Sequence, residues 1–366
     1  MIIKSLELKN YRNYEALSLE PSDGTNIFYG DNAQGKTNIL EAVYVCATSK
    51  SHRGSRDKEM IRFGQEDAHI CMKVERGQVL HKIDMHLKKN KVKGIAVDGI
   101  IIKKYSQLFG VVNVVLFSPE DLGIIKNGPG ERRRFIDMEL CQLNRLYMHH
   151  LMNYTKVLNQ RNNLLKQIGS DAALMDTLDI WDMQLSEYGR FLIRERRKFI
   201  EELNKIIGEI HRKLSGDKEI LTIEYEPSIS EAEFEEKLAS KRKYDIKTKT
   251  TSAGPHRDDI SFFIHGIDIR RFGSQGQQRT AALSLKLAEI ELVRRVTNDK
   301  PVLLLDDVLS ELDSNRQNYL LESIKDIQTM ITCTGLDEFV NHRFEIDRVY
   351  HVSGGSIECG SKPVGI

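Results

Sequence analysis

Hydrophobic and polar residues alternate along much of the first third of the chain. Between residues 80 and 88, the apolar side chains Ile83, Met85 and Leu87 fall on one face, and polar or charged side chains occupy the positions between them. Alternation with a period of two is typical of a strand with one buried and one solvated face. Residues 1 to about 120 are therefore predicted to be mostly β.

The pattern changes to helical spacing after Gly128-Pro129-Gly130. Apolar residues recur every three or four positions between residues 140 and 168, and again between 181 and 210. This spacing places them on one stripe of a helix. We expect two long antiparallel helices, each of about 30 residues and about 45 Å, with a break at residues 169–171.

The last third of the chain mixes both patterns. Residues 220–272 return to strand-like patterning, and residues 283–296 are predicted to form a helix. The run from Val302 to Leu305 is wholly apolar, which is typical of a buried parallel strand. Residues 330–334 are its expected neighbour. The order of these elements predicts an α/β fold.

Length, charge and cysteine content narrow the class of protein. A chain of 366 residues is long enough for two or three structural units. Its 54 basic and 53 acidic residues give a net charge of +1, so a nucleic-acid surface would have to come from local clusters of charge. The five cysteines form no C-x-x-C pair, and neither a signal peptide nor a membrane span is evident. We expect a cytoplasmic protein with reduced thiols.

The most specific motif is GDNAQGKT at residues 30–37, which matches the P-loop pattern G-x-x-x-x-G-K-T. The glycines allow the backbone to wrap around phosphates, and the backbone N–H groups supply hydrogen bonds. Lys36 is expected to neutralise the β- and γ-phosphates, and Thr37 to place its hydroxyl on Mg²⁺. A predicted strand at residues 26–29 and a predicted helix at 38–47 flank the loop, as the motif requires.

A second motif, PVLLLDD at residues 301–307, combines an apolar strand with two carboxylates. Asp306 is expected to hold Mg²⁺, and Asp307 to orient the attacking water. Because the two motifs stand near opposite ends of the chain, a large insertion must separate the two halves of one nucleotide-binding sheet.

A third motif, SQGQQR at residues 274–279, precedes the predicted helix. It is similar to the signature motif of the ATP-binding-cassette (ABC) superfamily, where a serine and a glycine at a helix start face phosphate. An ordinary helix cap is the alternative interpretation. Residues 310–313, SELD, resemble the D-loop of that superfamily.

Several segments together resemble the RecF family over nearly the whole chain. They are NYRNY at 10–14, FSPED at 117–121, GP at 128–129 followed by Arg132 and Arg133, GPHRDD at 254–259, and SQGQQR at 274–279. The resemblance implies an ABC-type ATPase head, built on a P-loop mixed sheet, with a second lobe that carries a helical arm. Lobe I is expected at residues 1–120 and 300–366, and lobe II at 121–299.

The resemblance also implies an ATP site that two copies of the chain complete together, with ATP and Mg²⁺ as cofactors. The implied ATP-binding residues are Arg12, Gly30, Asn32, Gln34, Gly35, Lys36, Thr37 and Asn38. The implied catalytic residues are Lys36 and Asp307, and the metal ligands are Thr37 and Asp306. Ser274, Gly276 and Gln277 would reach the nucleotide of the partner copy.

Members of the resembled family act in recombinational repair and replication. The chain is therefore expected to clamp double-stranded or gapped DNA as an ATP-induced homodimer and, with RecR and RecO, to help load recombinase. The candidate DNA-binding residues are Arg53, Lys88, Lys89, Arg194 and Arg197, and each has a solvated surface residue as its alternative interpretation. No aromatic residues interleave with these clusters, which favours sequence-independent contacts to duplex phosphates over stacking of single-stranded bases.

Three positions depart from the wider superfamily. No glutamine follows the strand that ends at Phe117, Thr334 replaces the usual switch histidine, and Asp307 is one methylene shorter than glutamate. These departures leave the γ-phosphate sensors open and predict slow ATP hydrolysis. With the DNA-binding role that the resemblance implies, the chain is expected to be a weak, DNA-stimulated ATPase. The ATPase subunit of a membrane transporter and a small-molecule P-loop kinase are the alternative functions.

Overall fold

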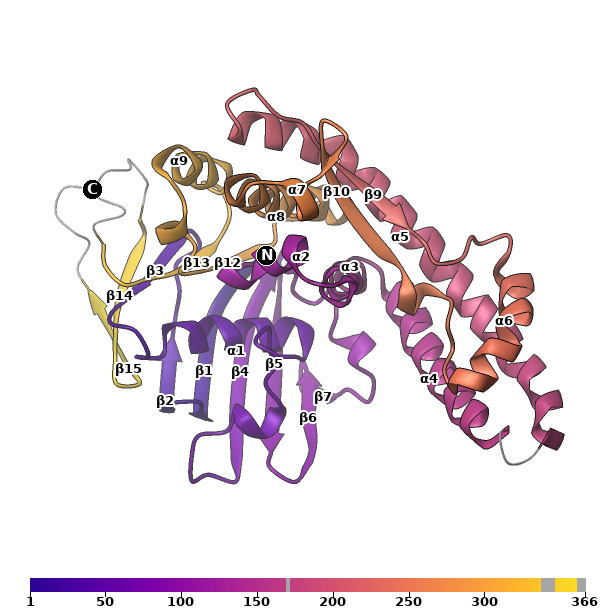
Figure 1. Cartoon of the computed structure of the whole chain (residues 1–366). Coiled ribbons are helices and arrows are strands. Elements are labelled where there is room, and N and C mark those ends of the chain that lie inside the picture. The colour runs from indigo at the N-terminus through magenta and orange to yellow at the C-terminus, as the bar shows by residue number, and fades with distance from the viewer. Residues whose placement is uncertain (169–171, 337–345, 361–366) are drawn as a thin grey trace. The chain divides into compact units, whose positions relative to one another are not determined.

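The computed structural model describes residues 1–168, 172–336 and 346–360 (Figure 1), so the predicted break at 169–171 lies outside the described residues. The chain divides into two compact units. Unit 1 contains Met1–Asp121 and the described residues from Leu285 onward, and unit 2 contains Leu122–Ser284. Unit 2 is thus an insertion between the two chain segments that build unit 1.

The first sheet of unit 1 is antiparallel, with strand order β2-β1-β4-β5-β6-β7. Its strands are β1 (Ile2–Tyr11), β2 (Tyr14–Leu19), β4 (Asp67–Arg76), β5 (Val79–Lys88), β6 (Lys91–Val97) and β7 (Ile100–Ile101). Ile83, Met85 and Leu87 of β5 are fully buried, while Lys82 and His86 are exposed. The predicted alternation, with one buried and one solvated face, is confirmed.

The second sheet of unit 1 has the order β15-β14-β3-β13-β12-β8. Its strands are β3 (Thr25–Tyr29), β8 (Val114–Phe117), β12 (Val302–Asp306), β13 (Thr329–Cys333), β14 (Arg348–Ser353) and β15 (Ser356–Gly360). All neighbours pair in parallel except β14 and β15. The predicted parallel strand at 302–305 and its predicted neighbour are confirmed, with β13 pairing to β3 on its other side.

Helix α1 (Lys36–Thr48) contributes to one hydrophobic core with both sheets. Ile39, Leu40 and Val43 of α1 cluster with apolar residues of β1, β4 and β5 and with Leu304 and Met330 of the parallel sheet. Helix α9 (Ser314–Ser323) also belongs to unit 1. The strand and helix predicted around the P-loop are therefore present and anchored in the core.

Unit 2 combines helices with a three-stranded sheet of order β11-β10-β9. Its strands are β9 (Leu221–Glu226), β10 (Asp259–Ile264) and β11 (Ile267–Asp268). Its helices are α2 (Leu122–Lys126), α3 (Pro129–Leu143), α4 (Arg145–Ile168), α5 (Leu178–Leu214), α6 (Phe234–Thr248) and α7 (Ile269–Phe272), and α8 (Gln275–Thr297) begins in unit 2 and ends in unit 1. Short 3₁₀ turns span Asp57–Glu59, Tyr105–Gln107, Pro119–Asp121, Ala172–Thr177, Pro255–Arg257 and Leu309–Glu311. None of the described helices is long and apolar enough to cross a membrane.

The predicted helical hairpin is present as α4 and α5, which pack side by side (Figure 1), but the predicted lengths are wrong. The first helix does not run on from residue 140, because Asn144 separates α3 from α4 and its side chain accepts hydrogen bonds from the backbone N–H groups of Leu146 (2.9 Å) and Tyr147 (3.1 Å). This is the action of a helix N-cap. Helix α4 has 24 residues and α5 has 37, or about 36 and 55 Å.

Helix α6 was not predicted, since residues 220–272 were interpreted as strand-like throughout. The segment is mostly charged, and its buried residues are only Phe234, Leu238 and Asp245. Spacings of four and seven residues place these three on one helical face. The helical pattern is weak in the sequence because one of these three positions is an aspartate instead of an apolar residue.

Asp245 is buried because it belongs to an ion-pair network centred on Arg161 of α4. Nε of Arg161 donates to Asp182 of α5 (2.6 Å), and a terminal nitrogen donates to Asp245 (2.8 Å) and to Thr251 (2.9 Å). The side chains of Arg161 and Asp245 are both 0% exposed. A buried arginine between two carboxylates thus ties α4, α5 and α6 together.

Replacing Arg161 should destabilise unit 2 strongly. Arg161→Ala leaves the buried carboxylate of Asp245 without its cation, while Asp182 keeps its ion pair with Arg242 (2.7 Å). We expect the free energy of unfolding to fall by about 3–5 kcal/mol. Urea unfolding followed by the fluorescence of Trp181, the only tryptophan in the sequence and a neighbour of the α4–α5 core, measures this change.

Arg190→Ala is the matched control. Arg190 lies on α5 and pairs with Glu235 at the surface, with side chains 41% and 62% exposed. Its loss should cost less than about 1 kcal/mol. Equal effects of the two substitutions would contradict a structural role for the Arg161 network.

Candidate nucleotide-binding site

The candidate site lies at the carboxyl ends of three neighbouring parallel strands of the second sheet of unit 1. The P-loop follows β3, Asp306 is the last residue of β12 and Asp307 follows it, and β13 lies between these two strands. Residues 30–37 and 306–307 are thereby neighbours, although they stand near opposite ends of the chain. Ligands of open α/β sheets bind at this edge.

Two positions in the P-loop can be occupied only by glycine. Gly30 has φ +148° and Gly35 has φ +114°, a region that side chains disfavour. A Cβ at Gly30 would collide with the carbonyl oxygen of Val352, and one at Gly35 would lie 2.5 Å from Nδ2 of Asn13. The loop is therefore held tightly against β14 and against the turn between β1 and β2.

Side chains around the P-loop hold its backbone in place. Asn13 donates to the carbonyl oxygen of Gln34 (2.7 Å) and accepts a hydrogen bond from the Asn38 amide (2.8 Å). The Tyr14 hydroxyl donates to the carbonyl oxygen of Gly35 (3.1 Å), and Oε1 of Gln34 accepts from the backbone N–H of Gly354 (2.7 Å). Gln34 and Asn38 thus support the loop conformation, whereas Asn32 is exposed on it. Asn13 and Tyr14 were recognised only as part of a family segment.

The side chain of Lys36 folds back over the loop. Its Nζ donates to the carbonyl oxygens of Gly30 (2.6 Å) and Asp31 (3.0 Å), and the residue is only 4% exposed. A lysine ammonium has three hydrogens, so it can bind these two carbonyls and still donate to a further anion. Lys36 therefore lies over the loop, and its predicted contact with phosphate stays a prediction.

Asp306 is the polar centre of the site. Its Oδ1 accepts hydrogen bonds from the hydroxyls of Thr37 (2.8 Å) and Thr332 (2.8 Å). Burial raises the pKa of the Asp306 carboxyl despite these two hydrogen bonds. Thr37 and Asp306, the two predicted metal ligands, are thus in direct contact.

Thr332 also positions Asp307, and its role was not predicted from the sequence. Its hydroxyl oxygen accepts a hydrogen bond from the backbone N–H of Asp307 (3.0 Å). Asp307 itself has φ +52°, a left-handed conformation that aspartate tolerates better than most residues. The available signal was a threonine in the interior of a short strand whose neighbouring residues, Ile331 and Cys333, are apolar.

Arg12 lies beside the site as part of a buried ion pair. Its Nε and one terminal nitrogen contact the two carboxylate oxygens of Glu41 on α1, at 2.7 and 2.6 Å. The other terminal nitrogen donates to the carbonyl oxygen of Glu59 (2.8 Å). Burial opposes ionisation of Glu41, but hydrogen bonds from Arg12 and Ser51 outweigh it and lower the pKa of this carboxyl. Arg12 therefore fixes α1 to the β1–β2 turn, and its predicted contact with ATP stays a prediction.

The signature-like segment belongs to unit 2 and forms the start of α8. Oγ of Ser274 accepts from the backbone N–H of Gln277 (3.2 Å), and Oε1 of Gln277 accepts from the backbone N–H of Ser274 (2.9 Å). This reciprocal pair is a capping box. Nε2 of Gln277 also donates to Glu219 (2.8 Å). Ser274 and Gly276 are exposed.

The candidate DNA-binding residues are distributed over both units. Arg53 is exposed and donates to Oδ1 of Asn38 (3.3 Å) at the start of α1. Lys88 and Lys89 lie at the end of β5, where Lys89 pairs with Glu66 at 3.0 Å. On α5, Arg194 and Arg197 pair with Glu195 (3.6 Å) and Glu231 (3.5 Å). All five residues are exposed, and their contacts with DNA stay predictions.

Comparisons with known proteins identify the family of the chain. The family model described as "RecF/RecN/SMC N terminal domain" matches residues 2–358. The protein named "DNA replication and repair protein RecF" of Lachnoclostridium phytofermentans is 66% identical over 98% of this chain and 100% of its own length. The protein of the same name from Agathobacter rectalis is 60% identical over 98% and 99%.

A solved structure is similar over almost the whole fold. It is titled "Structure of the recombination mediator protein RecF-ATP in RecFOR pathway", and it has a TM-score of 0.92 and 36% identity over 98% of both chains. The predicted fold class, an ABC-type ATPase head with a helical arm, is confirmed. The chain belongs to the RecF family.

Proposed function

We propose that this chain binds ATP with Mg²⁺ and that ATP joins two copies into a DNA clamp for recombinational repair. The hydrogen bond between Thr37 and Asp306 carries this proposal, because it joins the end of the P-loop to a buried carboxylate 269 residues away. The glycine-rich backbone, a helix N-terminus and Lys36 surround the same sheet edge. They supply what a triphosphate requires.

The residues of the site fit a magnesium ion. The Asp306 carboxylate and the Thr37 hydroxyl are oxygen donors of the kind that Mg²⁺ prefers. Burial raises the pKa of Asp306, and a bound cation would favour its charged form. When bound, Mg²⁺ neutralises charge on the phosphates. Asp307 would orient the attacking water, and Lys36 would hold the phosphates.

Dimer formation is supported by the surface around the signature-like segment. A Cβ at Gly276 would meet only Oγ of Ser274, at 3.8 Å, so nothing in the described part of the chain requires glycine there. Glycine at such a position permits close approach of a second molecule. Phe272, just before the segment, is 74% exposed. These features fit Ser274, Gly276 and Gln277 facing the nucleotide of a partner copy.

The place of this activity in repair follows from family membership. Relatives are named DNA replication and repair proteins, and a similar structure is assigned to the RecFOR pathway. Double-stranded or gapped DNA, RecR and RecO are therefore the proposed partners in the cytoplasm. A membrane-transporter subunit is not supported, since the relatives reported above are repair proteins.

ATP should control the mass of the protein in solution. Light scattering should give a monomer without nucleotide and a dimer with Mg-ATP, because ATP bound between two copies stabilises the dimer by mass action. Ser274→Arg should remove the ATP-dependent dimer by placing a large side chain in the contact.

Ser240→Arg is the control for this experiment. Ser240 is exposed on α6 of the same unit, so the same change there should leave dimer formation intact. A mass that never responds to ATP, even with duplex DNA present, would contradict the proposal.

Asp307→Asn should slow ATP hydrolysis by about 100-fold or more, since a positioned carboxylate contributes roughly that much. Asparagine tolerates the same positive φ, so the backbone should be kept, and the ATP-bound dimer should persist longer than that of the wild type. Phosphate release and light scattering measure the two effects. Asp67→Asn, an exposed change in the same unit, should alter neither, and unchanged hydrolysis by Asp307→Asn would exclude the proposed role.

Duplex binding should weaken steeply with salt, because contacts to phosphates release counterions. Replacing Arg194 and Arg197 with glutamine should reduce the slope of log K against log [salt] by up to about 2. Fluorescence anisotropy with a labelled duplex measures the slope, and the exposed Lys126→Gln serves as control. An unchanged slope would show that Arg194 and Arg197 of α5 do not contact the DNA phosphates.

A further inference from the structure

Helix α4 of unit 2 carries positive charge and no negative charge. Its sequence, from Arg145 to Ile168, contains no aspartate or glutamate. The cations Arg145, Lys156 and Lys166 are exposed, whereas Arg161 is buried in its ion-pair network. Within the described part of the chain, no ion pair holds Arg145, Lys156 or Lys166. These exposed charges are therefore available to a ligand.

The exposed cations belong to a stripe on one side of α4. Steps of three or four residues along a helix place its members on one face. This α4 stripe consists of Arg145, His149, Met152, Lys156, Asn159, Asn163 and Lys166, all of which are exposed. Apart from Met152, its members are cations, amides and one imidazole, which can all donate hydrogen bonds. At a rise of 1.5 Å per residue the stripe is about 32 Å long.

Helix α5, which lies beside α4 (Figure 1), has a different surface. Acidic residues occur along its whole length, at Asp179, Asp182, Glu187, Glu195, Glu201, Glu202 and Glu209. Its exposed lysines are paired within the helix: Lys198 with Glu195 (3.1 Å), Lys205 with Glu202 (2.5 Å) and Lys213 with Glu209 (3.0 Å). Mixed signs of this kind are typical of a solvated helix. The lack of carboxylates is therefore a property of α4 and not of the whole hairpin.

The geometry of the α4 stripe favours a long, regular polyanion. Along the helix axis, Arg145 and Lys156 are about 17 Å apart, and Lys156 and Lys166 are about 15 Å apart, so the cations do not converge on one small anion. The stripe is nearly as long as one turn of B-DNA, about 34–36 Å. A helix that lies in a membrane surface needs an apolar face, and single-strand binding uses aromatic side chains. The α4 stripe has neither an apolar face nor a phenylalanine, tyrosine or tryptophan.

The first turns of α4 are close to a residue that is already a candidate for DNA binding. His150 of α4 stacks on Phe191 of α5, with ring centroids 4.0 Å apart. The guanidinium of Arg194 lies 5.2 Å from the centroid of the same Phe191 ring. The α4 stripe therefore continues the surface to which Arg194 belongs, with cations that have no carboxylate partner.

We propose that the α4 stripe binds the phosphate backbone of double-stranded DNA. Arg145, Lys156 and Lys166 would contact phosphates, and the amides of Asn159 and Asn163 would donate further hydrogen bonds. Such contacts position a duplex without reading its sequence. The inference rests on the proposed function, since it names a surface for the DNA partner. It assigns that contact to cations that do not have to break an ion pair, unlike Arg194 and Arg197.

Removing the three cations should change the salt dependence of duplex binding. The variant combines Arg145→Gln, Lys156→Gln and Lys166→Gln. The probe is a fluorescein-labelled duplex of about 30 base pairs, or roughly three helical turns, and fluorescence anisotropy with the full chain and Mg-ATP measures binding. Each phosphate contact contributes about 0.9 to the slope of log K against log [salt]. The slope should therefore fall by roughly 2–3.

A triple change on α5 is the matched control. Lys198→Gln, Lys205→Gln and Lys213→Gln together remove the same charge, but from lysines that are paired with glutamates. This variant should change the slope by less than about 1. Light scattering should show that both triple variants keep the ATP-dependent dimer, so that a lost DNA contact is distinguished from a lost dimer.

A gain of charge tests the same surface without relying on the stability of the triple variant. Asn163→Lys adds a cation to the α4 stripe, and it should raise the slope by about 1. Ser240→Lys adds the same charge at an exposed position of α6 and should leave the slope unchanged.

Equal losses of slope in the α4 and α5 triple variants would overturn the proposal. So would slopes that neither the α4 triple variant nor Asn163→Lys changes while the wild type binds the duplex. Tighter binding of phosphatidylglycerol vesicles, or of a single strand of the same length, with the same dependence on the three cations, would assign the stripe to another polyanion. A wild-type protein that binds no duplex would contradict the proposed DNA role itself, and this inference with it.

Discussion

Parallel pairing of β3 with β13 is the constraint on which the candidate site depends. Thr25 to Tyr29 pair in register with Thr329 to Cys333, so the strand before the P-loop is fixed beside a strand from the far end of the chain. Strand β12 then adds on the other side of β13. This order brings Oδ1 of Asp306 within 2.8 Å of the Thr37 hydroxyl. It also places the Thr332 hydroxyl where it bonds to the Asp306 carboxylate and to the backbone N–H of Asp307.

Unit 2, the insertion between these strands, is stabilised by other interactions than unit 1. Unit 1 has a large apolar core with α1 at its centre, whereas unit 2 also relies on buried arginines. Arg132, Arg161 and Arg196 are each no more than 2% exposed and pair with carboxylates from other elements. Removing one partner of a buried pair leaves an uncompensated charge, so these networks fix which elements pack together.

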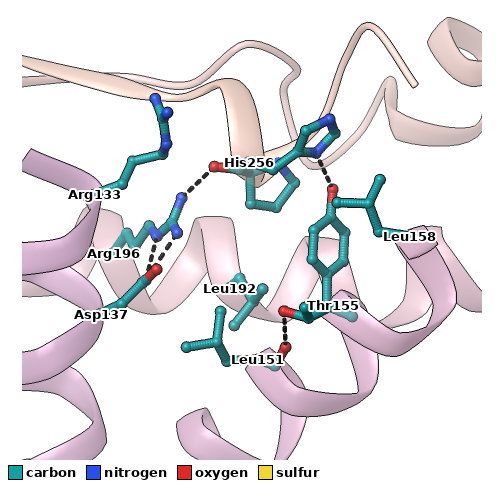
Figure 2. A pocket seen from close by; sticks show the side chains of 10 residues that line it. Arg133, Asp137, Leu151, Thr155, Leu158, Leu192, Arg196 and His256 are labelled. Carbon is teal, nitrogen blue, oxygen red and sulfur yellow. Dashed lines mark hydrogen bonds and ion pairs between the residues drawn. The ribbon is translucent and has the colours of Figure 1, made fainter. Parts of the chain in front are cut away.

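The segment GPHRDD at residues 254–259 takes part in these buried networks of unit 2. Asp258 pairs with Arg196, Asp259 pairs with Arg132, and His256 bonds to Tyr154. The segment therefore joins the helices of unit 2 to the strand β10 and forms one wall of the cavity in Figure 2. In the sequence it served only as a mark of family resemblance.

The features that depend on local pattern could be predicted from the order of the residues alone. The alternation in β5, the apolar run of β12 and the P-loop with its flanking strand and helix could all be predicted, because each is encoded by neighbouring residues. The remaining features depend on contacts between distant parts of the chain. Helix α6 was missed because it buries an aspartate whose partner, Arg161, lies 84 residues away. The sequence also did not predict three other features, namely the bond from Thr332 to Asp306, the Arg12–Glu41 pair and the cavity beside His256. Long-range contacts between polar side chains leave no periodicity in the sequence, and only the packing of distant elements brings them together.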